Sequence, residues 1–179
     1  MPFDFEILYF IQEHIVTPAL SHIMIFASTL GEYGFIWVLT AVILIFFKKT
    51  RACGALILCS LVFCLVTGEF ITKNLVCRVR PCYQDITINM LVNRPDSYSF
   101  PSGHTASSFT SASTIFYFNK KAGGLALALA SIIAFSRMYL FVHFPTDVFA
   151  GALWGIVGSV IVLLIYKKYF LTNSKKLIK

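Results

Sequence analysis

Residues 147–166 read DVFAGALWGIVGSVIVLLIY, and no charged side chain follows the aspartate with which the stretch begins. A helix needs about 20 mainly apolar residues to cross the hydrocarbon core of a bilayer. The stretch is therefore long enough and apolar enough to be a transmembrane helix. Lys167 and Lys168 follow directly, as is typical of a helix that ends at a membrane surface.

The composition of the whole chain also indicates a membrane protein. Of its 179 residues, 58% are hydrophobic and 13% are charged, whereas a soluble domain carries about 25% charged residues. We therefore expect one integral membrane domain over 1–179 and no separate soluble module. At the N-terminus no basic region precedes an apolar run and no small-residue cleavage site follows, so we expect no removable signal peptide.

Apolar runs separated by polar breaks predict five membrane crossings. Residues 3–16 come before them and mix apolar with acidic side chains, which favours an amphipathic helix in the membrane interface that Pro18 ends. Residues 20–30 are too short to cross alone, and we interpret them as a broken or re-entrant lead-in within the N-terminal segment 1–32. The crossings are expected at roughly 33–47, 52–76, 104–118, 123–141 and 147–166.

The predicted fold is therefore an all-α integral membrane protein, a bundle of about five transmembrane helices plus an N-terminal interfacial helix. Gly151, Gly155 and Gly158 form a stripe of small residues of the kind that lets membrane helices pack closely. Cys77 and Cys82 could form a disulfide or remain two free thiols, because sequence alone cannot fix their geometry.

The net charge of +7 would suit a nucleic-acid partner, but the distribution of the charge argues against one. Ten of the 15 basic residues lie in three clusters, each at the end of an apolar run, and we interpret the clusters as cytoplasmic anchors. The loop 78–100, the segment 142–146 and the acidic N-terminus then face away from the cytoplasm. The clusters are Lys48, Lys49 and Arg51; Lys120 and Lys121; and Lys167, Lys168, Lys175, Lys176 and Lys179.

A first polar block, Lys73-x6-Arg80-Pro81, lies at the end of the second predicted span. Seven residues are close to two helical turns, so the spacing predicts that Lys73 and Arg80 share one helix face, in a helix that Pro81 ends. Two interfacial cations that extend toward lipid headgroups would explain the block equally well. Glu69 lies four residues before Lys73, and we expect it to pair with Lys73 or another cation of the blocks, or to stay protonated.

A second block, Pro101-Ser102-Gly103-His104, precedes the third predicted span. It has the form of a helix start, with Ser102 or a neighbour as the N-cap. Free backbone N–H groups at a helix N-terminus favour an anion, and Gly103 lets the backbone approach it closely. An ordinary helix cap with a bystander His104 is the alternative.

A third block, Ser136-Arg137-x5-His143-x3-Asp147, carries the most specific chemistry. A new helix is expected to begin at Pro145, which puts Asp147 in its first turn, within reach of His143. A carboxylate on one imidazole nitrogen fixes the tautomer and leaves the other nitrogen as a nucleophile. A structural histidine beside a helix-capping aspartate is the alternative for this block alone.

Together, the three blocks fall on one membrane face under a topology derived from other residues. Their pattern is similar to the signature of the type 2 phosphatidic acid phosphatase family, which includes membrane lipid phosphatases and, more distantly, vanadium haloperoxidases and glucose-6-phosphatase. Every position of the signature matches, and the resemblance covers roughly 52–166, the expected catalytic core. Many members have six spans, so the five expected here leave the N-terminal topology open.

The resemblance implies a role for each residue of the three blocks. His143 would be the nucleophile that forms a phosphohistidine, Asp147 would orient it, and His104 would be the general acid that later helps to activate water. No metal and no other cofactor is implied, because cations can supply the charge stabilisation that a metal would give in phosphoryl transfer. The phosphate-binding residues would be Lys73, Arg80, Ser102, Gly103 and Arg137.

The expected function is hydrolysis of a lipid phosphate or diphosphate at the outer face of the cell membrane, with undecaprenyl diphosphate as the best substrate prediction. Phosphatidylglycerophosphate and phosphatidic acid remain alternatives, because the signature binds the phosphate and not the lipid tail. The expected partners are the lipid phosphate and the bilayer, with no nucleic acid and with the oligomeric state open. A non-catalytic anion-binding protein or transporter is the alternative of another class, and haloperoxidase chemistry is improbable in so hydrophobic a chain.

Overall fold

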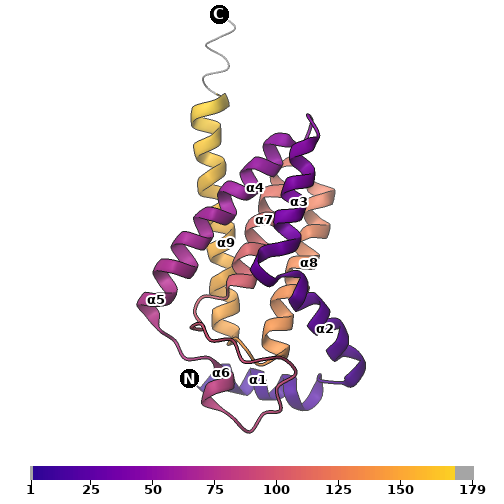
Figure 1. Cartoon of the computed structure of the whole chain (residues 1–179), viewed down its shortest axis with the longest axis vertical. Coiled ribbons are helices and arrows are strands. Elements are labelled where there is room, and N and C mark those ends of the chain that lie inside the picture. Colours follow the sequence, from indigo (N-terminus) through magenta and orange to yellow (C-terminus); the bar gives the residue numbers. More distant parts are fainter. Residues whose placement is uncertain (1, 172–179) are drawn as a thin grey trace, which may run out of the picture.

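A computed structural model describes residues 2–171 (Figure 1). It is a bundle of helices built around one polar helix. Residues 2–171 contain helices, turns and loops but no strand. The N-terminal half contains α1 (Pro2–His14), α2 (Pro18–Leu30), the short η1 (Glu32–Gly34), α3 (Phe35–Phe46), α4 (Arg51–Cys64), the π-helical η2 (Leu65–Thr72), α5 (Lys73–Val76) and α6 (Pro81–Gln84). The C-terminal half contains α7 (Gly103–Phe118), α8 (Lys120–Tyr139), α9 (Pro145–Tyr166) and the π-helical η3 (Lys167–Leu171).

Helix α7 packs against α4, α8 and α9, which leaves much of its surface in contact with protein. Its buried side chains include a row of hydroxyls that hydrogen-bond within the helix or to its neighbours. Trp37 of α3 donates its ring N–H to the Ser108 hydroxyl at 2.9 Å, and the Thr114 and Ser159 hydroxyls lie 3.0 Å apart. Hydroxyl pairs of this kind join helices in a membrane. A helix enclosed in this way can be less apolar than one that faces lipid.

The glycine stripe of α9 lets this helix contact the backbone of α7. A Cβ atom on Gly155 would lie 2.4 Å from the Ala106 carbonyl oxygen, and one on Gly151 would lie 2.7 Å from that of Ser102. The predicted role of the stripe in helix packing is confirmed. The close approach also joins the two helix starts, because the Ser102 N–H donates to the Asp147 carbonyl oxygen at 3.1 Å.

The predicted helical membrane bundle is confirmed, whereas the count of five crossings stays a prediction. Within residues 2–171, three stretches are long and apolar enough to span a bilayer: Arg51–Gln84, Lys120–Tyr139 and Pro145–Tyr169. Helices α2 and α3 qualify as a fourth span only as a pair, bent by 49°. Helix α7, the expected span over 104–118, has 16 residues and falls short of the length for a span.

The N-terminal helix forms as expected, but Pro18 does not end it. Helix α1 ends at His14, and Pro18 is the first residue of α2, with Thr17 as its N-cap. Proline suits this position because its fixed φ matches a helix and its missing N–H is not needed there. Helix α1 lies across one end of the bundle (Figure 1). There the Tyr9 hydroxyl donates a hydrogen bond to Asp85, which directly follows α6, at 2.8 Å.

The two ends of the bundle differ in charge, as the sequence predicts. The α3–α4 turn, the α7–α8 turn and the end of α9 carry the basic clusters and lie at one end, opposite α1, α6 and the loop after α6 (Figure 1). Lys175, Lys176 and Lys179 lie outside the described residues. Of the two cysteines left open above, Cys77 is exposed, Cys82 is buried, and both are free thiols.

Candidate active site

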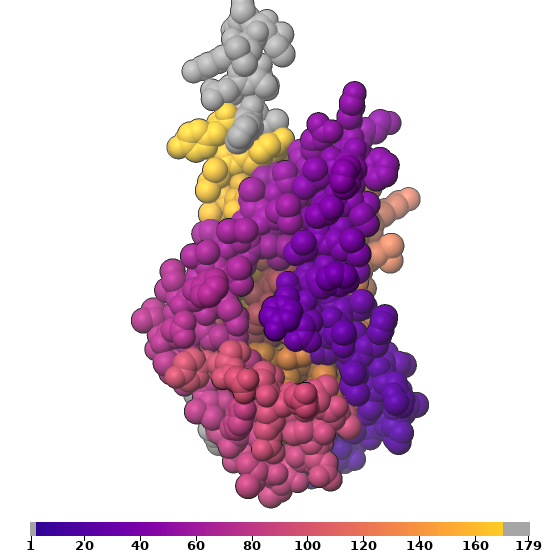
Figure 2. Space-filling view, viewed as in Figure 1, coloured from indigo at the N-terminus to yellow at the C-terminus, as the bar shows by residue number. Residues whose placement is uncertain are grey.

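The three polar blocks meet at the end of the bundle where α7 and α9 begin and α8 ends. Five of their ionisable side chains are buried, with at most 7% of their surface exposed: Lys73, Arg80, Arg137, His143 and Asp147. The three cations also act on His143 electrostatically. Figure 2 shows a recess between α2, α5 and the loop after α6, with orange atoms of the α8–α9 region in its depth. The predicted convergence of the blocks is therefore present.

The prediction that Lys73 and Arg80 share one helix face is wrong. Helix α5 ends at Val76, Cys77 has a φ of +50°, and Arg80 is extended before Pro81 begins α6. A residue before proline avoids the helical region, and proline favours the first position of a helix, so Pro81 starts a helix here instead of ending one. The side chains of Lys73 and Arg80 reach the same site from two separate backbone segments.

His143 presents its Nε2 atom to Arg80, whose Nη1 donates a hydrogen bond to it at 2.9 Å. A guanidinium can only donate, so Nε2 is the acceptor and the neutral ring carries its proton on Nδ1. Burial, together with the charges of Arg80, Arg137 and Lys73, lowers the pKa of His143 well below its usual range. Near neutral pH the imidazole is therefore uncharged, with a lone pair on Nε2.

Asp147 stands behind the imidazole, in the first turn of the helix that begins at Pro145, as the sequence predicts. Its Oδ2 lies 3.6 Å from His143 Nδ1, somewhat beyond hydrogen-bond length. The same oxygen accepts hydrogen bonds from the Phe144 N–H, at 2.9 Å, and from the Ser99 hydroxyl, which itself lies 3.5 Å from Nδ1. The other oxygen, Oδ1, accepts a hydrogen bond from Arg78 Nη1 at 2.6 Å. The carboxylate is thus held by three groups, the Phe144 N–H, the Ser99 hydroxyl and the Arg78 guanidinium, on one side of the ring.

Arg80 is held by the loop after α6. Its Nε donates to the Ser97 carbonyl oxygen at 2.6 Å, and its Nη2 donates to the Ser97 hydroxyl at 2.9 Å. Its Nη1 also donates to the Val142 carbonyl oxygen at 2.9 Å, beside its bond to His143. These contacts fix the guanidinium directly in front of His143 Nε2.

Arg137 and His104 each carry a buried nitrogen that has no hydrogen-bond partner among residues 2–171. For Arg137 this atom is Nε, and its Nη1 donates to the Ser28 hydroxyl of α2. For His104 it is Nε2, and the ring packs against Gly31 at the bend between α2 and α3. Buried polar atoms are rarely left without a partner. Both atoms fit a site that hydrogen-bonds an anion.

The helix start at Ser102 and Gly103 is confirmed, because Ser102 is the N-cap and Gly103 the first residue of α7. The Ser102 hydroxyl does not cap the helix but accepts a hydrogen bond from Thr105 at 3.0 Å. A Cβ atom on Gly103 would lie 2.8 Å from Glu69 Oε2. Glu69 also forms an ion pair with Lys73, so the expected pairing is confirmed. A carboxylate therefore lies against the helix start that was predicted to bind an anion.

Four residues that hold this site were not predicted from the sequence. Ser97 holds Arg80, Ser99 holds Asp147, and Arg78 and Asp4 form the ion pairs behind Asp147. Only Arg78 could have been suspected, because it is a third cation within the first block. The others lie in a loop and an N-terminal helix that show no relation to the blocks until the chain is folded.

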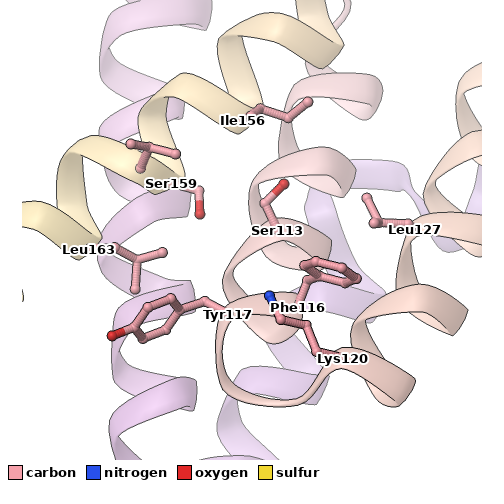
Figure 3. Close-up of a pocket in the computed structure, with 9 residues that line it drawn as sticks. Ser113, Phe116, Tyr117, Lys120, Leu127, Ile156, Ser159 and Leu163 are labelled. Carbon is pink, nitrogen blue, oxygen red and sulfur yellow. The ribbon is translucent and has the colours of Figure 1, made fainter.

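A second hollow, of about 290 Å³, lies near the opposite end of α7. Its lining includes Ser113, Phe116, Tyr117 and Lys120, together with Ile156 and Leu163 of α9 (Figure 3). Ser113 is ten residues after Gly103, which is about 15 Å along a helix. This hollow is therefore separate from the candidate active site.

The chain is similar to a known family of proteins. The model of the PAP2 superfamily matches residues 50–171. The undecaprenyl-diphosphatase of the archaeon Sulfolobus acidocaldarius is 34% identical over 137 residues, which is 76% of this chain and 66% of that protein. The chain thus spans slightly less than two thirds of the length of this relative.

Two solved structures share the fold. The crystal structure of LpxE from Aquifex aeolicus aligns with a TM-score of 0.78 and 28% identity, over 89% of this chain and 93% of that one. A PAP2 type phosphatidylglycerolphosphate phosphatase from Bacillus subtilis aligns with a TM-score of 0.72 and 28% identity, over 87% and 80% of the two chains. Both alignments cover more than four fifths of this chain.

Proposed function

This chain belongs to the PAP2 superfamily, and we propose that it is a membrane lipid phosphatase that hydrolyses undecaprenyl diphosphate through a phosphohistidine on His143. The observation that carries the proposal is the state of His143. A buried, uncharged imidazole offers its Nε2 lone pair to a guanidinium, with a carboxylate behind the opposite nitrogen. Binding an anion requires cations alone, whereas a neutral histidine in this orientation suits nucleophilic attack.

In the first step, His143 Nε2 attacks the terminal phosphorus of the lipid diphosphate. The N–P bond forms as the bond from phosphorus to the bridging oxygen breaks. The leaving lipid monophosphate takes a proton from His104, which has to enter the step as an imidazolium whose charge the bound diphosphate balances. The His143 proton stays on Nδ1, beside Asp147 and Ser99. Water then attacks the phosphohistidine, gives a proton to His104, and releases inorganic phosphate while Nε2 regains its lone pair.

The phosphoryl oxygens would be bound by Lys73, Arg80 and Arg137, with Ser102 and Gly103 at the start of α7. Arg80 has to transfer its Nη1 hydrogen bond from His143 Nε2 to a phosphoryl oxygen when the substrate enters. The same guanidinium thereby frees the nucleophile and binds the group that it attacks. Donors aimed at developing negative charge usually supply the largest part of such catalysis.

The choice of substrate rests on the relatives. The Sulfolobus relative is named an undecaprenyl-diphosphatase. Phosphatidylglycerophosphate is the second candidate, because the Bacillus subtilis structural neighbour is described as a phosphatase of that lipid. Phosphatidic acid is the third, since the three blocks contact only the phosphate.

A substrate panel tests this proposal. Purified protein in detergent with EDTA should release phosphate fastest from undecaprenyl diphosphate, more slowly from phosphatidylglycerophosphate and phosphatidic acid, and vanadate should inhibit it. His143→Ala should abolish release and the acid-labile phosphoenzyme, whereas the exposed His22→Ala should leave both unchanged. Undiminished turnover in His143→Ala would remove the nucleophile from the proposal. Vanadate binding without turnover of any of these lipids would favour an anion-binding protein.

We also propose that the site opens to the extracytoplasmic face. Support comes from the basic clusters, which lie at the opposite end of the bundle and which the positive-inside rule assigns to the cytoplasm. Cys77 is exposed at the end of α5, near the site. A membrane-impermeant maleimide added to intact cells should label the protein but not its Cys77→Ser variant. Labelling only after the cells are broken would reverse the assigned face.

A further inference from the structure

The N-terminal helix reaches the candidate active site through Asp4, an acidic side chain with 1% of its surface exposed. Helix α1 packs beneath the loop that carries His143, where Phe5 meets the Phe144 ring edge-on at 5.2 Å between centroids. A helix that only anchored the chain in the membrane interface would turn its carboxylates toward water. Glu6, two residues later on the same helix, is exposed in this way.

Arg78 lies between two buried carboxylates. Its Nη1 donates to Asp147 Oδ1 at 2.6 Å, and its Nη2 donates to Asp4 Oδ2 at 2.7 Å. Its guanidinium also stacks 4.0 Å above the centre of the Phe144 ring. The three contacts fix both the position and the plane of the guanidinium, so that it can hold the carboxylate of Asp147 in one orientation.

Asp4 has a second set of contacts, at the start of α9. Its Oδ1 accepts the Thr146 N–H at 3.2 Å, and its Oδ2 accepts the Thr146 hydroxyl at 2.9 Å. Thr146 directly precedes Asp147, and its hydroxyl also lies 2.7 Å from Arg78 Nη1. One carboxylate of α1 therefore holds both the guanidinium and the backbone turn that present Asp147 to His143.

We propose that Asp4 and Arg78 are positioning residues for the nucleophile, so that α1 is part of the catalytic unit. Arg78 occupies Oδ1 of Asp147 and thereby keeps Oδ2 turned toward His143 Nδ1, and Asp4 keeps Arg78 in that position. This inference rests on the proposed function of His143. Arg78 contacts Asp147, and Asp4 contacts Arg78 and the start of α9, so their loss should slow the chemical step and leave substrate binding nearly unchanged.

The simpler explanation is a buried ion pair that attaches α1 to the bundle and does nothing more. Such a pair would affect stability, because removal of one partner leaves the other charge buried and uncompensated. It would not affect the tautomer of His143 or kcat in molecules that remain folded. These two quantities therefore separate a positioning role from a structural one.

The first test compares Asp4→Asn with Glu6→Gln, which removes a charge of the same sign from the same helix. Asp4→Asn should lower kcat about tenfold and Arg78→Gln about 100-fold, in line with the cost of a small misplacement of a catalytic group. KM should change less than about twofold, and Glu6→Gln should match the wild type. Asp4→Glu should recover most of the lost kcat.

The double variant tests whether the two residues act in series. If Asp4 works through Arg78, the Asp4→Asn change should cost little once Arg78→Gln is present, so the two losses should not multiply. Multiplying losses, or a kcat for Asp4→Asn equal to that of Glu6→Gln, would overturn the proposal. Arg78→Lys keeps the charge but cannot span both carboxylates, and it should fall between Arg78→Gln and the wild type.

A measurement without substrate separates this proposal from the proposed function. In protein with ¹⁵N-labelled histidine, the wild-type His143 signal should be that of a neutral ring protonated on Nδ1. Asp4→Asn and Arg78→Gln should increase the fraction protonated on Nε2, and Glu6→Gln should not. An unchanged spectrum in both variants would overturn the positioning role, whatever the activity. A changed spectrum in a protein without phosphatase activity would support the positioning role and refute the proposed function.

Discussion

Arg80 Nη1 donates a hydrogen bond to His143 Nε2 at 2.9 Å, so the proposed nucleophile is covered by one of the cations expected to bind its target. Arg80→Gln should therefore lower kcat/KM by about 100- to 1000-fold, the range found when a donor to developing negative charge is removed. Initial rates on undecaprenyl diphosphate measure the effect. Arg94→Gln is the control, because Arg94 lies in the loop after α6 and stacks on the Tyr83 ring, and an equal loss in both variants would contradict the assigned role.

The low pKa of His143 has a consequence for stability in acid. Unfolded histidine takes up a proton near pH 6.5, whereas buried His143 stays neutral to a much lower pH, so the unfolded state gains protons first as the pH falls. Below pH 6.5 the free energy of unfolding should fall by about 1.4 kcal/mol per pH unit through this group. Thermal unfolding of the wild type and of His143→Gln between pH 7.5 and 5 should show a steeper acid loss in the wild type. Parallel curves would mean that His143 is protonated in the folded protein.

Glu69 lies against Lys73 and the start of α7, where we propose that the phosphate binds. Glu69→Gln removes a negative charge beside this region, and the variant should bind vanadate about tenfold more tightly, which corresponds to about 1.4 kcal/mol. Inhibition constants for vanadate give the comparison, with the exposed Glu13→Gln in α1 as the control. Weaker binding in Glu69→Gln would show instead that Glu69 is needed to orient Lys73.

The contact between α7 and α9 makes Gly155 sensitive to a single methyl group. A Cβ atom there would lie 2.4 Å from a backbone oxygen of α7, so Gly155→Ala should lower stability by about 1–3 kcal/mol. Gly124→Ala in α8 is the matched control, because nothing lies within 4 Å of its Cβ position. That variant should be neutral or more stable by about 0.5–1 kcal/mol. Thermal unfolding in detergent measures both changes, and equal behaviour of the two would exclude close packing as the role of the stripe.

The sequence predicts the parts of this structure that depend on local physics. Hydrophobic length identifies α4, α8 and α9, and Pro145 marks the start of α9 because proline is favoured there. At Pro18 and Pro81 the prediction is a helix end, whereas the structure has a helix start at each of them. Proline is incompatible with the interior of a helix but compatible with its first turn, so its presence alone does not say on which side the helix lies.

The residues that support the site contact partners that are distant from them in the sequence. Ser99 reaches Asp147 across 48 positions, and Asp4 reaches Thr146 across 142. Neither Ser99 nor Asp4 stands at a regular spacing from the three blocks or beside a residue of them. The pattern of hydrophobic residues gives no information about such distant pairs. Helix α7 shows the same limit, because the sequence predicts a span over 104–118, whereas the helix has 16 residues and packs against α4, α8 and α9.

The contact between Asp4 and Thr146 also sets an order of assembly. Asp4 leaves the ribosome before any other part of the site, yet its hydrogen-bond partners lie on residues made much later, at Arg78 and at the start of the last long helix. Asp4 can therefore pair with Arg78 first, but its contacts with Thr146 have to wait until the start of α9 has been synthesised. Until then Asp147 cannot be presented to His143, so a nascent chain that already carries the first two blocks remains inactive.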